Sequence, residues 1–242
     1  MWAVRRIPNW SFPSWKRLWG ENTMPKAIFG FSKWFLLLLT LFLGRTAVAA
    51  EAPSMDAEAY NHRGIAYYKQ GQYNQAIADY TKALQINPKY ADVYNNRGLA
   101  YYKQEQYDQA IADYTKALQI SPSDAEVYNN RGVVYGVMRQ YDQAIADFTK
   151  ALEINPKYAE AYNNRAVIYW RKGQHDQAIS DFTKALEINP KYAEAYNNRA
   201  YAYYYLKDYD RAWADLHEAQ QLGAKIDTGF LKILREASGR EE

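Results

Sequence analysis

The sequence predicts an all-α solenoid of five stacked pairs of antiparallel helices, on three observations. A motif of the form Tyr-Asn-x-Arg-Gly/Ala recurs every 34 residues, and each period holds two amphipathic helical patterns. A proline follows the second pattern in the first four periods. A fixed period of this length is typical of arrays in which every unit buries its apolar faces against its neighbours. The motif begins at Tyr60, Tyr94, Tyr128, Tyr162 and Tyr196.

The first period shows how its two helices are predicted. Small and apolar residues recur at three-to-four spacing over residues 57–70 and again over residues 73–86, which places one apolar stripe on each helix. Gly71 and Gln72 form the turn between them. Pro88 ends the second helix, because proline cannot continue a helix and restricts the residue before it. Neither short helix can bury its stripe alone, so the units must stack.

The first fifty residues differ in composition from the repeats. They carry seven Lys and Arg residues against one Glu, a net charge of +6, and since the whole chain carries +3, residues 51–242 carry −3. A mildly acidic repeat region argues against nucleic-acid binding, which normally uses a basic surface. The chain has no Cys, which excludes disulfides and thiolate metal sites.

A short apolar run over residues 34–44 predicts a signal peptide. Lys26 and Lys33 precede it, and an Ala-x-Ala cleavage pattern ends at Ala49. The run is well short of the roughly 20 residues that a spanning helix needs. We therefore expect export to the periplasm, the envelope or the thylakoid lumen of a bacterium. The alternative is an uncleaved leader that anchors a cytoplasm-facing protein in the membrane.

The predicted organisation has four parts. A leader covers residues 1–50, with Met24 as a candidate start of translation, and a linker covers residues 51–56. Residues 57–226 hold the five units of 34 residues. One further helical pattern and a charged tail follow in residues 227–242, where we expect a capping helix over the fifth unit.

Seven positions carry a recurring pattern within the units. A large residue opens the first helix (helix A), and Gly and Tyr follow; the second helix (helix B) has Ala, an aromatic residue and a second Ala before Pro. In the first unit these residues are Tyr60, Gly64, Tyr67, Ala76, Tyr80, Ala83 and Pro88. This pattern resembles the tetratricopeptide repeat, over about 70% of the chain. The fourth and fifth units depart from it with Ala166 and Ala200 at the Gly position and Leu216 at the aromatic position.

The resemblance implies both an architecture and a function. The repeats of this family form a right-handed superhelix in which helices A line a concave, protein-binding surface. We therefore expect a scaffold for protein–protein interaction that serves in assembly, rather than an enzyme, and no cofactor. The expected partner is a protein, bound as an extended peptide or an amphipathic helix, with membrane contact only through an uncleaved leader.

Every unit departs from the family in the same way. An Arg stands on helix A where the family usually has Leu, and an Asp follows 16 residues later on helix B. We predict an ion pair that fixes the register of the two helices; the alternative is an Arg that extends past packed methylenes to water. The predicted pairs are Arg63 with Asp79, Arg97 with Asp113, Arg131 with Asp147, Arg165 with Asp181, and Arg199 with Asp215.

The resemblance also assigns a candidate binding surface to positions five, six and twelve of each unit, counted from Ala57 in the first. An Asn amide both donates and accepts, so a ladder of Asn side chains beside aromatic rings suits a peptide backbone. The alternative is that one Asn of each pair only bonds its own helix. The predicted binding residues are Asn61, Asn95, Asn96, Asn129, Asn130, Asn163, Asn164, Asn197, Asn198, Tyr68, Tyr102, Trp170 and Tyr204.

Other kinds of site lack support in the sequence. Some members of the family grip a C-terminal carboxylate with Lys at position five and Arg at position six two units on, but here these positions hold Asn61 and Asn130. His62, His175 and His217 lie in different units without a metal-ligand spacing. We therefore predict no catalytic residues and no metal site.

Overall fold

A computed structural model describes residues 55–240, which contain eleven α-helices and no strand. The predicted leader, with Met24, lies outside the described residues. Each unit forms a helix A of 13 residues and a helix B of 13 or 14 residues, and one more helix follows the fifth unit. The helices are α2 (Ala57–Lys69), α3 (Tyr73–Ile86), α4 (Ala91–Lys103), α5 (Tyr107–Ile120), α6 (Ala125–Val137), α7 (Tyr141–Ile154), α8 (Ala159–Arg171), α9 (His175–Ile188), α10 (Ala193–Tyr205), α11 (Tyr209–Gln221) and α12 (Thr228–Ser238).

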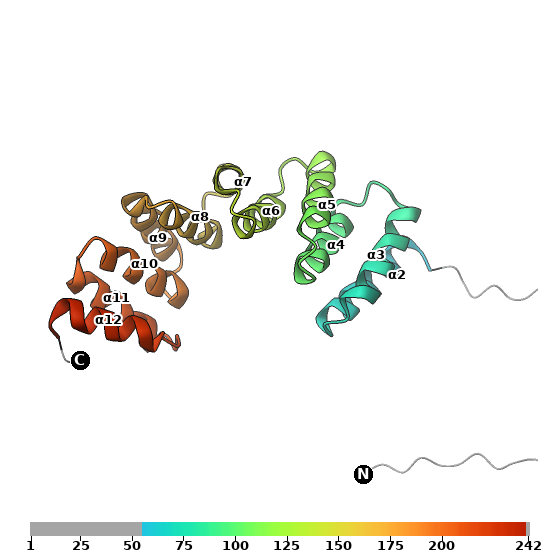
Figure 1. Ribbon diagram of the computed structural model, residues 1–242. Helices are drawn as coiled ribbons and strands as arrows, with labels where there is room; N and C mark the ends of the chain where they lie inside the picture. The colour runs from blue at the N-terminus through green and yellow to red at the C-terminus, as the bar shows by residue number, and fades with distance from the viewer. Residues whose placement is uncertain (1–54, 241–242) are drawn as a thin grey trace, which may run out of the picture. The chain divides into compact units, whose positions relative to one another are not determined.

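The helices stack in chain order (Figure 1), which confirms the predicted all-α solenoid. Each helix A packs on its own helix B, and each helix B of the first four units packs on the next helix A. Successive A helices also touch one another, from α2 through α4, α6 and α8 to α10. Successive B helices within residues 55–240 make no comparable contact, so the A helices lie closer together than the B helices. The side formed by the A helices is therefore the concave one.

The core alternates small and large side chains. Ala76 is fully buried and the neighbouring Tyr80 is 1% exposed. Tyr80 packs directly over Gly64 of helix A, where an added Cβ would lie 2.6 Å from the ring. The same contact recurs between Gly98 and Tyr114. Small residues on one helix therefore make room for an aromatic ring on its partner, as close packing requires.

The turn between helix A and helix B repeats one backbone conformation. Position 15 of each unit has a positive φ, 74° at Gly71 and Gly173 but 60° at Glu105, Arg139 and Lys207. This left-handed region favours glycine and is sparsely used by other residues. Three of the five turns therefore hold a side chain where the other two have none.

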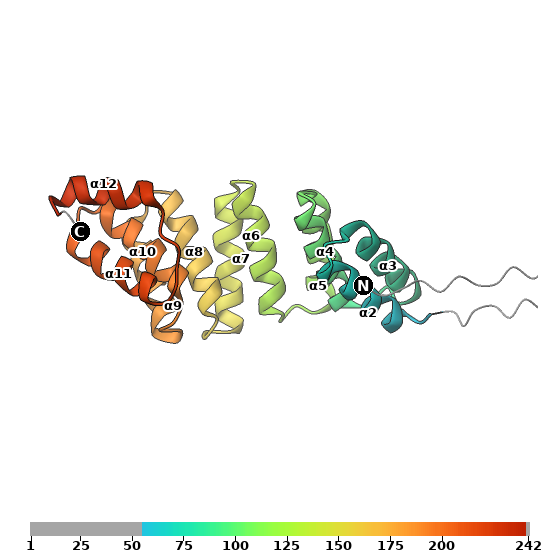
Figure 2. The same cartoon turned by 90° about the horizontal axis from the view of Figure 1, so that it is seen from below.

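The last helix closes the C-terminal end of the array (Figure 2). The Asp227 side chain accepts a hydrogen bond of 2.7 Å from the Phe230 backbone, which starts α12. Phe230 and Leu234 are buried in one cluster with Tyr203 and Trp213 of the fifth unit. Within residues 55–240, no helix has the length and apolarity needed to cross a bilayer.

Candidate functional site

An Arg–Asp pair joins the two helices of every unit. Each Arg donates from Nε to Asp Oδ2 at 2.5–2.8 Å and from Nη2 to Asp Oδ1 at 2.7–2.9 Å. The five Asp side chains are buried. The hydrogen bonds and charge of Asp147 raise the pKa of Arg131 above its usual value. The position that the family gives to Leu thus holds a bidentate ion pair in every unit.

The same arginines also link successive units. Nη1 donates to a Thr of the preceding helix B at 2.9–3.0 Å, in the pairs Arg97 with Thr81, Arg131 with Thr115, Arg165 with Thr149, and Arg199 with Thr183. Arg63 opens the array and makes no such bond, and its side chain is 42% exposed against 16–17% for the other four. These residues therefore hold the frame that positions the A helices.

The Asn residues form a second link between units. The amide nitrogen at position six donates to the amide oxygen at position five of the preceding unit at 3.0–3.2 Å. Asn61, Asn129 and Asn163 are consequently buried. In the last unit the Asn197 oxygen is buried and has no partner in the described part of the chain. The position-five oxygens of the first four units thus join each unit to the next.

A groove runs across the A helices of units three to five. It consists of three adjoining pockets of about 220, 170 and 420 Å³. Arg171 lines all three pockets and Trp170 lines two of them. We call it the Arg171 groove; its principal lining residues are Val133, Gly136, Val137, Arg139, Asn164, Val167, Trp170, Arg171, His175, Asn198, Tyr201 and Tyr205.

Only part of the predicted binding set meets in this groove. Asn164, Asn198 and Trp170 line it. Asn96 and Asn130 make the inter-unit amide bonds but line none of the three pockets.

The other predicted aromatic residues pack against rings of the repeats or of α12. Tyr68 packs on Tyr73 with ring centroids 5.4 Å apart, Tyr102 packs on Tyr107 at 6.1 Å, and Tyr204 packs on Phe230 at 5.7 Å. Their rings therefore stabilise the repeats and the cap, and they lie outside the Arg171 groove.

The groove lies where positions twelve and thirteen of the repeat no longer hold the residues of the first two units. Position twelve holds Tyr in the first two units but Gly136 in the third, where an added Cβ would meet Ile168 at 2.9 Å. Position thirteen holds Lys in the first two units but Val137 and Tyr205 in the third and fifth, and these side chains are 43% and 55% exposed. Exposed apolar side chains beside a pocket are typical of a binding surface. The lost periodicity was the sequence signal for Gly136, Val137, Arg171 and Tyr205, which the predicted set missed.

Comparison with family models decides the identity of the repeats. Models described as tetratricopeptide repeat match residues 66–105, 91–124, 125–158, 159–192 and 182–214. The chain belongs to the tetratricopeptide-repeat family. Tetratricopeptide repeats bind protein partners, and the chain is accordingly a scaffold for protein–protein interaction.

The solved structures of three other proteins resemble the array. MamA is 26% identical, with a TM-score of 0.61 over 66% of this chain and 93% of its own. PilF of Pseudomonas aeruginosa is 23% identical, with a TM-score of 0.69 over 76% of this chain and 84% of its own. PilW, a type IV pilus biogenesis factor, is 23% identical, with a TM-score of 0.70 over 76% of this chain and 87% of its own. At this identity PilF and PilW share the fold alone. Comparison with curated protein sequences gives no match.

Proposed function

We propose that the protein is an exported scaffold that holds a segment of a partner protein in the Arg171 groove. The observation that carries this proposal is the groove itself, where side chains of three successive A helices line adjoining pockets. Within this groove, Gly136 and Val137 replace the Tyr and Lys that the first two units hold at the same positions, and Val137 is exposed. An exposed apolar side chain beside a pocket favours a binding role.

The chemistry of the groove suits an apolar protein segment. Val167, Trp170 and Tyr201 form the wall of the 220 Å³ pocket, and Asn198 adds a polar group. Large aromatic and aliphatic surfaces provide most of the energy in protein interfaces, while a few polar groups fix orientation. An extended peptide or one face of an amphipathic helix satisfies both requirements.

Selection of short random peptides with blocked termini on the full chain tests the groove. Trp170→Ala should weaken the selected peptides by about tenfold or more, the effect of losing a contact worth about 1.4 kcal/mol. Tyr102→Ala is the matched control, because it removes a ring from the same position of the second unit, outside the groove. If the two variants lost peptide affinity equally and had the same melting temperature, the binding surface would lie outside the Arg171 groove.

Export is a separate part of the proposal and rests on the leader pattern. The apolar run over residues 34–44 and the Ala-x-Ala pattern ending at Ala49 support cleavage. We expect mass spectrometry of the protein from its native host to find a mature N-terminus near residue 50, in an exported fraction. A full-length leader in a membrane fraction would favour the anchored alternative. A role in the assembly of an envelope structure is proposed only for the exported form.

A further inference from the structure

Two arginines of the Arg171 groove differ from the arginines of the repeat motif. Arg139 and Arg171 line the same 420 Å³ pocket, at the end of the groove next to the A-to-B turns. Among the residues that the structure describes, neither makes an ion pair. Glu194 shares the adjoining 170 Å³ pocket with Arg171 and is not within ion-pair distance of it. The five arginines of the repeat motif, by contrast, are all bidentate to Asp.

Two buried polar atoms belong to residues that line the same pocket as these arginines. Trp170 Nε1 and His175 Nδ1 are buried without a hydrogen bond within residues 55–240, and both residues line the pocket of the two arginines. An indole N–H can only donate. A buried donor without a partner costs free energy, so a rotation of the indole that brings this N–H to an acceptor on a ligand would be favoured.

Tyr205 shapes this pocket from the fifth unit. Its ring stacks on His175, with centroids 5.4 Å apart and an angle of 15° between the planes. It also meets Trp170 edge-on, at 5.6 Å between centroids. The pocket thus combines aromatic walls, two cationic groups and an unused N–H donor, and it adjoins the apolar pocket of Val167, Trp170 and Tyr201.

We infer that the partner segment carries an acidic side chain beside a large apolar one. The carboxylate lies between Arg139 and Arg171, and the apolar side chain fills the neighbouring 220 Å³ pocket. Guanidinium groups match carboxylates in geometry and charge. This inference rests on the proposed function, since it names the chemistry of the segment that the groove binds.

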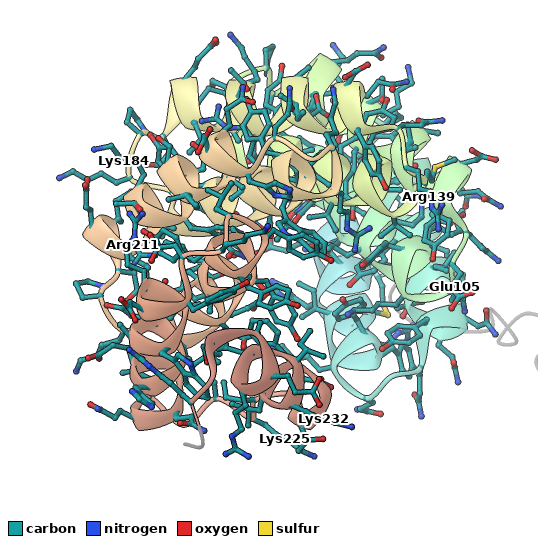
Figure 3. All side chains as sticks on the ribbon, turned by 60° about the vertical axis from the view of Figure 1, so that its left-hand side comes forward. Glu105, Arg139, Lys184, Arg211, Lys225 and Lys232 are labelled. Atoms are coloured by element: carbon teal, nitrogen blue, oxygen red, sulfur yellow. The ribbon has the colours of Figure 1, made fainter. Side chains whose placement is uncertain are left out.

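The backbone at Arg139 provides a variant that removes charge without loss of stability. Its φ of 60° lies in the left-handed region, where the equivalent residues of units one and four are Gly71 and Gly173. Arg139→Gly therefore relieves backbone strain and should not lower the melting temperature. Glu105→Gly is the matched control at the same turn of the second unit; Figure 3 shows Glu105 and Arg139 on the same edge of the array.

The test compares two forms of a peptide selected on the full chain with blocked termini. One form keeps its Asp and Glu residues, and the other replaces them with Asn and Gln. We expect the acidic form to bind about tenfold more tightly at low salt, and Arg171→Gln or Arg139→Gly to remove that difference. Lys103→Gln, at the position of Arg171 in the second unit, and Glu105→Gly should leave the difference unchanged.

The outcomes separate this inference from the proposed function. Peptides that lose binding in Trp170→Ala but show no preference for the acidic form would overturn the inference and leave the groove as the binding site. An acid preference that survives both arginine variants would also overturn it. If no selected peptide depends on Trp170, both proposals fail. Competition by a single-stranded oligonucleotide at the affinity of the acidic peptide would point to phosphate in place of carboxylate, and would overturn the inference as well.

Discussion

Asp147 illustrates the energetics of a single residue in the frame. Its buried carboxylate accepts two hydrogen bonds from Arg131, whose side chain is only 17% exposed. Asp147→Ala leaves that guanidinium without its counter-charge, so we expect the free energy of unfolding to fall by about 3 kcal/mol. The double variant Arg131→Leu/Asp147→Ala removes both charges and should recover much of the loss. Urea denaturation of the three proteins measures the difference.

The first unit supplies a control for this prediction. Arg63 is 42% exposed and has no Thr partner, so water can solvate it when its carboxylate is removed. Asp79→Ala should therefore cost less than Asp147→Ala. Equal losses at the two sites, or no loss at Asp147, would show that burial of the guanidinium does not determine the cost.

The helix-B tyrosines predict how stability depends on alkaline pH. Burial raises the pKa of Tyr80 and Tyr114 above the ordinary value of about 10. The folded state therefore holds protons that the unfolded state releases. Their contribution to stability is fully present below about pH 10 and is lost as the pH rises through the folded-state pKa.

Tyr80→Phe/Tyr114→Phe should consequently lose less stability between about pH 9 and pH 11 than the natural protein. Phe148 and Phe182 occupy the same position of units three and four, so the ring fits without the hydroxyl. Other buried tyrosines, such as Tyr158, whose pKa burial raises to about 12, are present in both proteins and cancel in the comparison. Parallel pH profiles in urea denaturation would contradict the prediction.

At the scale of the element, a small residue on α6 is matched by a large residue on α8. Gly136 of α6 faces Ile168 of α8. At the equivalent positions, the first unit has Tyr68 and the second unit has Ala100. Gly136→Tyr should be destabilising by about 1–3 kcal/mol, because the new side chain overlaps Ile168. Adding Ile168→Ala restores the pairing of the first two units and lets the ring approach Tyr141 of helix B.

A double-mutant cycle in denaturant tests this exchange. We expect a favourable coupling of about 0.5–3 kcal/mol between the two changes. The double variant also refills the 170 Å³ pocket of the Arg171 groove, so it should fold well and bind selected peptides less tightly. Additive effects on stability would mean that the sizes of the side chains at positions 136 and 168 are not coupled.

The helices themselves could be predicted because they depend on local and periodic signals. The 34-residue period, the apolar spacing and Pro88 sufficed for the helix pairs, and the predicted family and fold are confirmed. The surroundings of the predicted Asn residues could not be predicted as well, because Asn129 accepts a hydrogen bond from Asn164 of the next unit and no local sequence signal indicates that contact. Sequence periodicity identifies equivalent positions, but the groove consists of positions that are not equivalent.

At the scale of the molecule, the principal helix contacts within residues 55–240 join neighbouring units. Each helix of the repeat array packs on those adjacent in the stack, and the inter-unit Arg–Thr and Asn–Asn bonds reach one unit back. Stability in such arrays is approximately a sum of unit and interface terms. A local change should therefore affect nearby units first.

The cap offers a direct test of this locality. Phe230 is 2% exposed, and its ring stacks on Tyr201 of the last helix A at 3.7 Å between centroids, while Ile233 on the same helix is 41% exposed. Phe230→Ala should lower the local opening free energy of α10 and α11 by about 3 kcal/mol, which hydrogen exchange would record as roughly 100-fold faster exchange there. Ile233→Ala should have little effect, since it removes an exposed side chain. Amides of α2–α5 should keep their protection in Phe230→Ala, because three units separate them from the cap. Faster exchange throughout the array would instead mean that the five units open as one cooperative body.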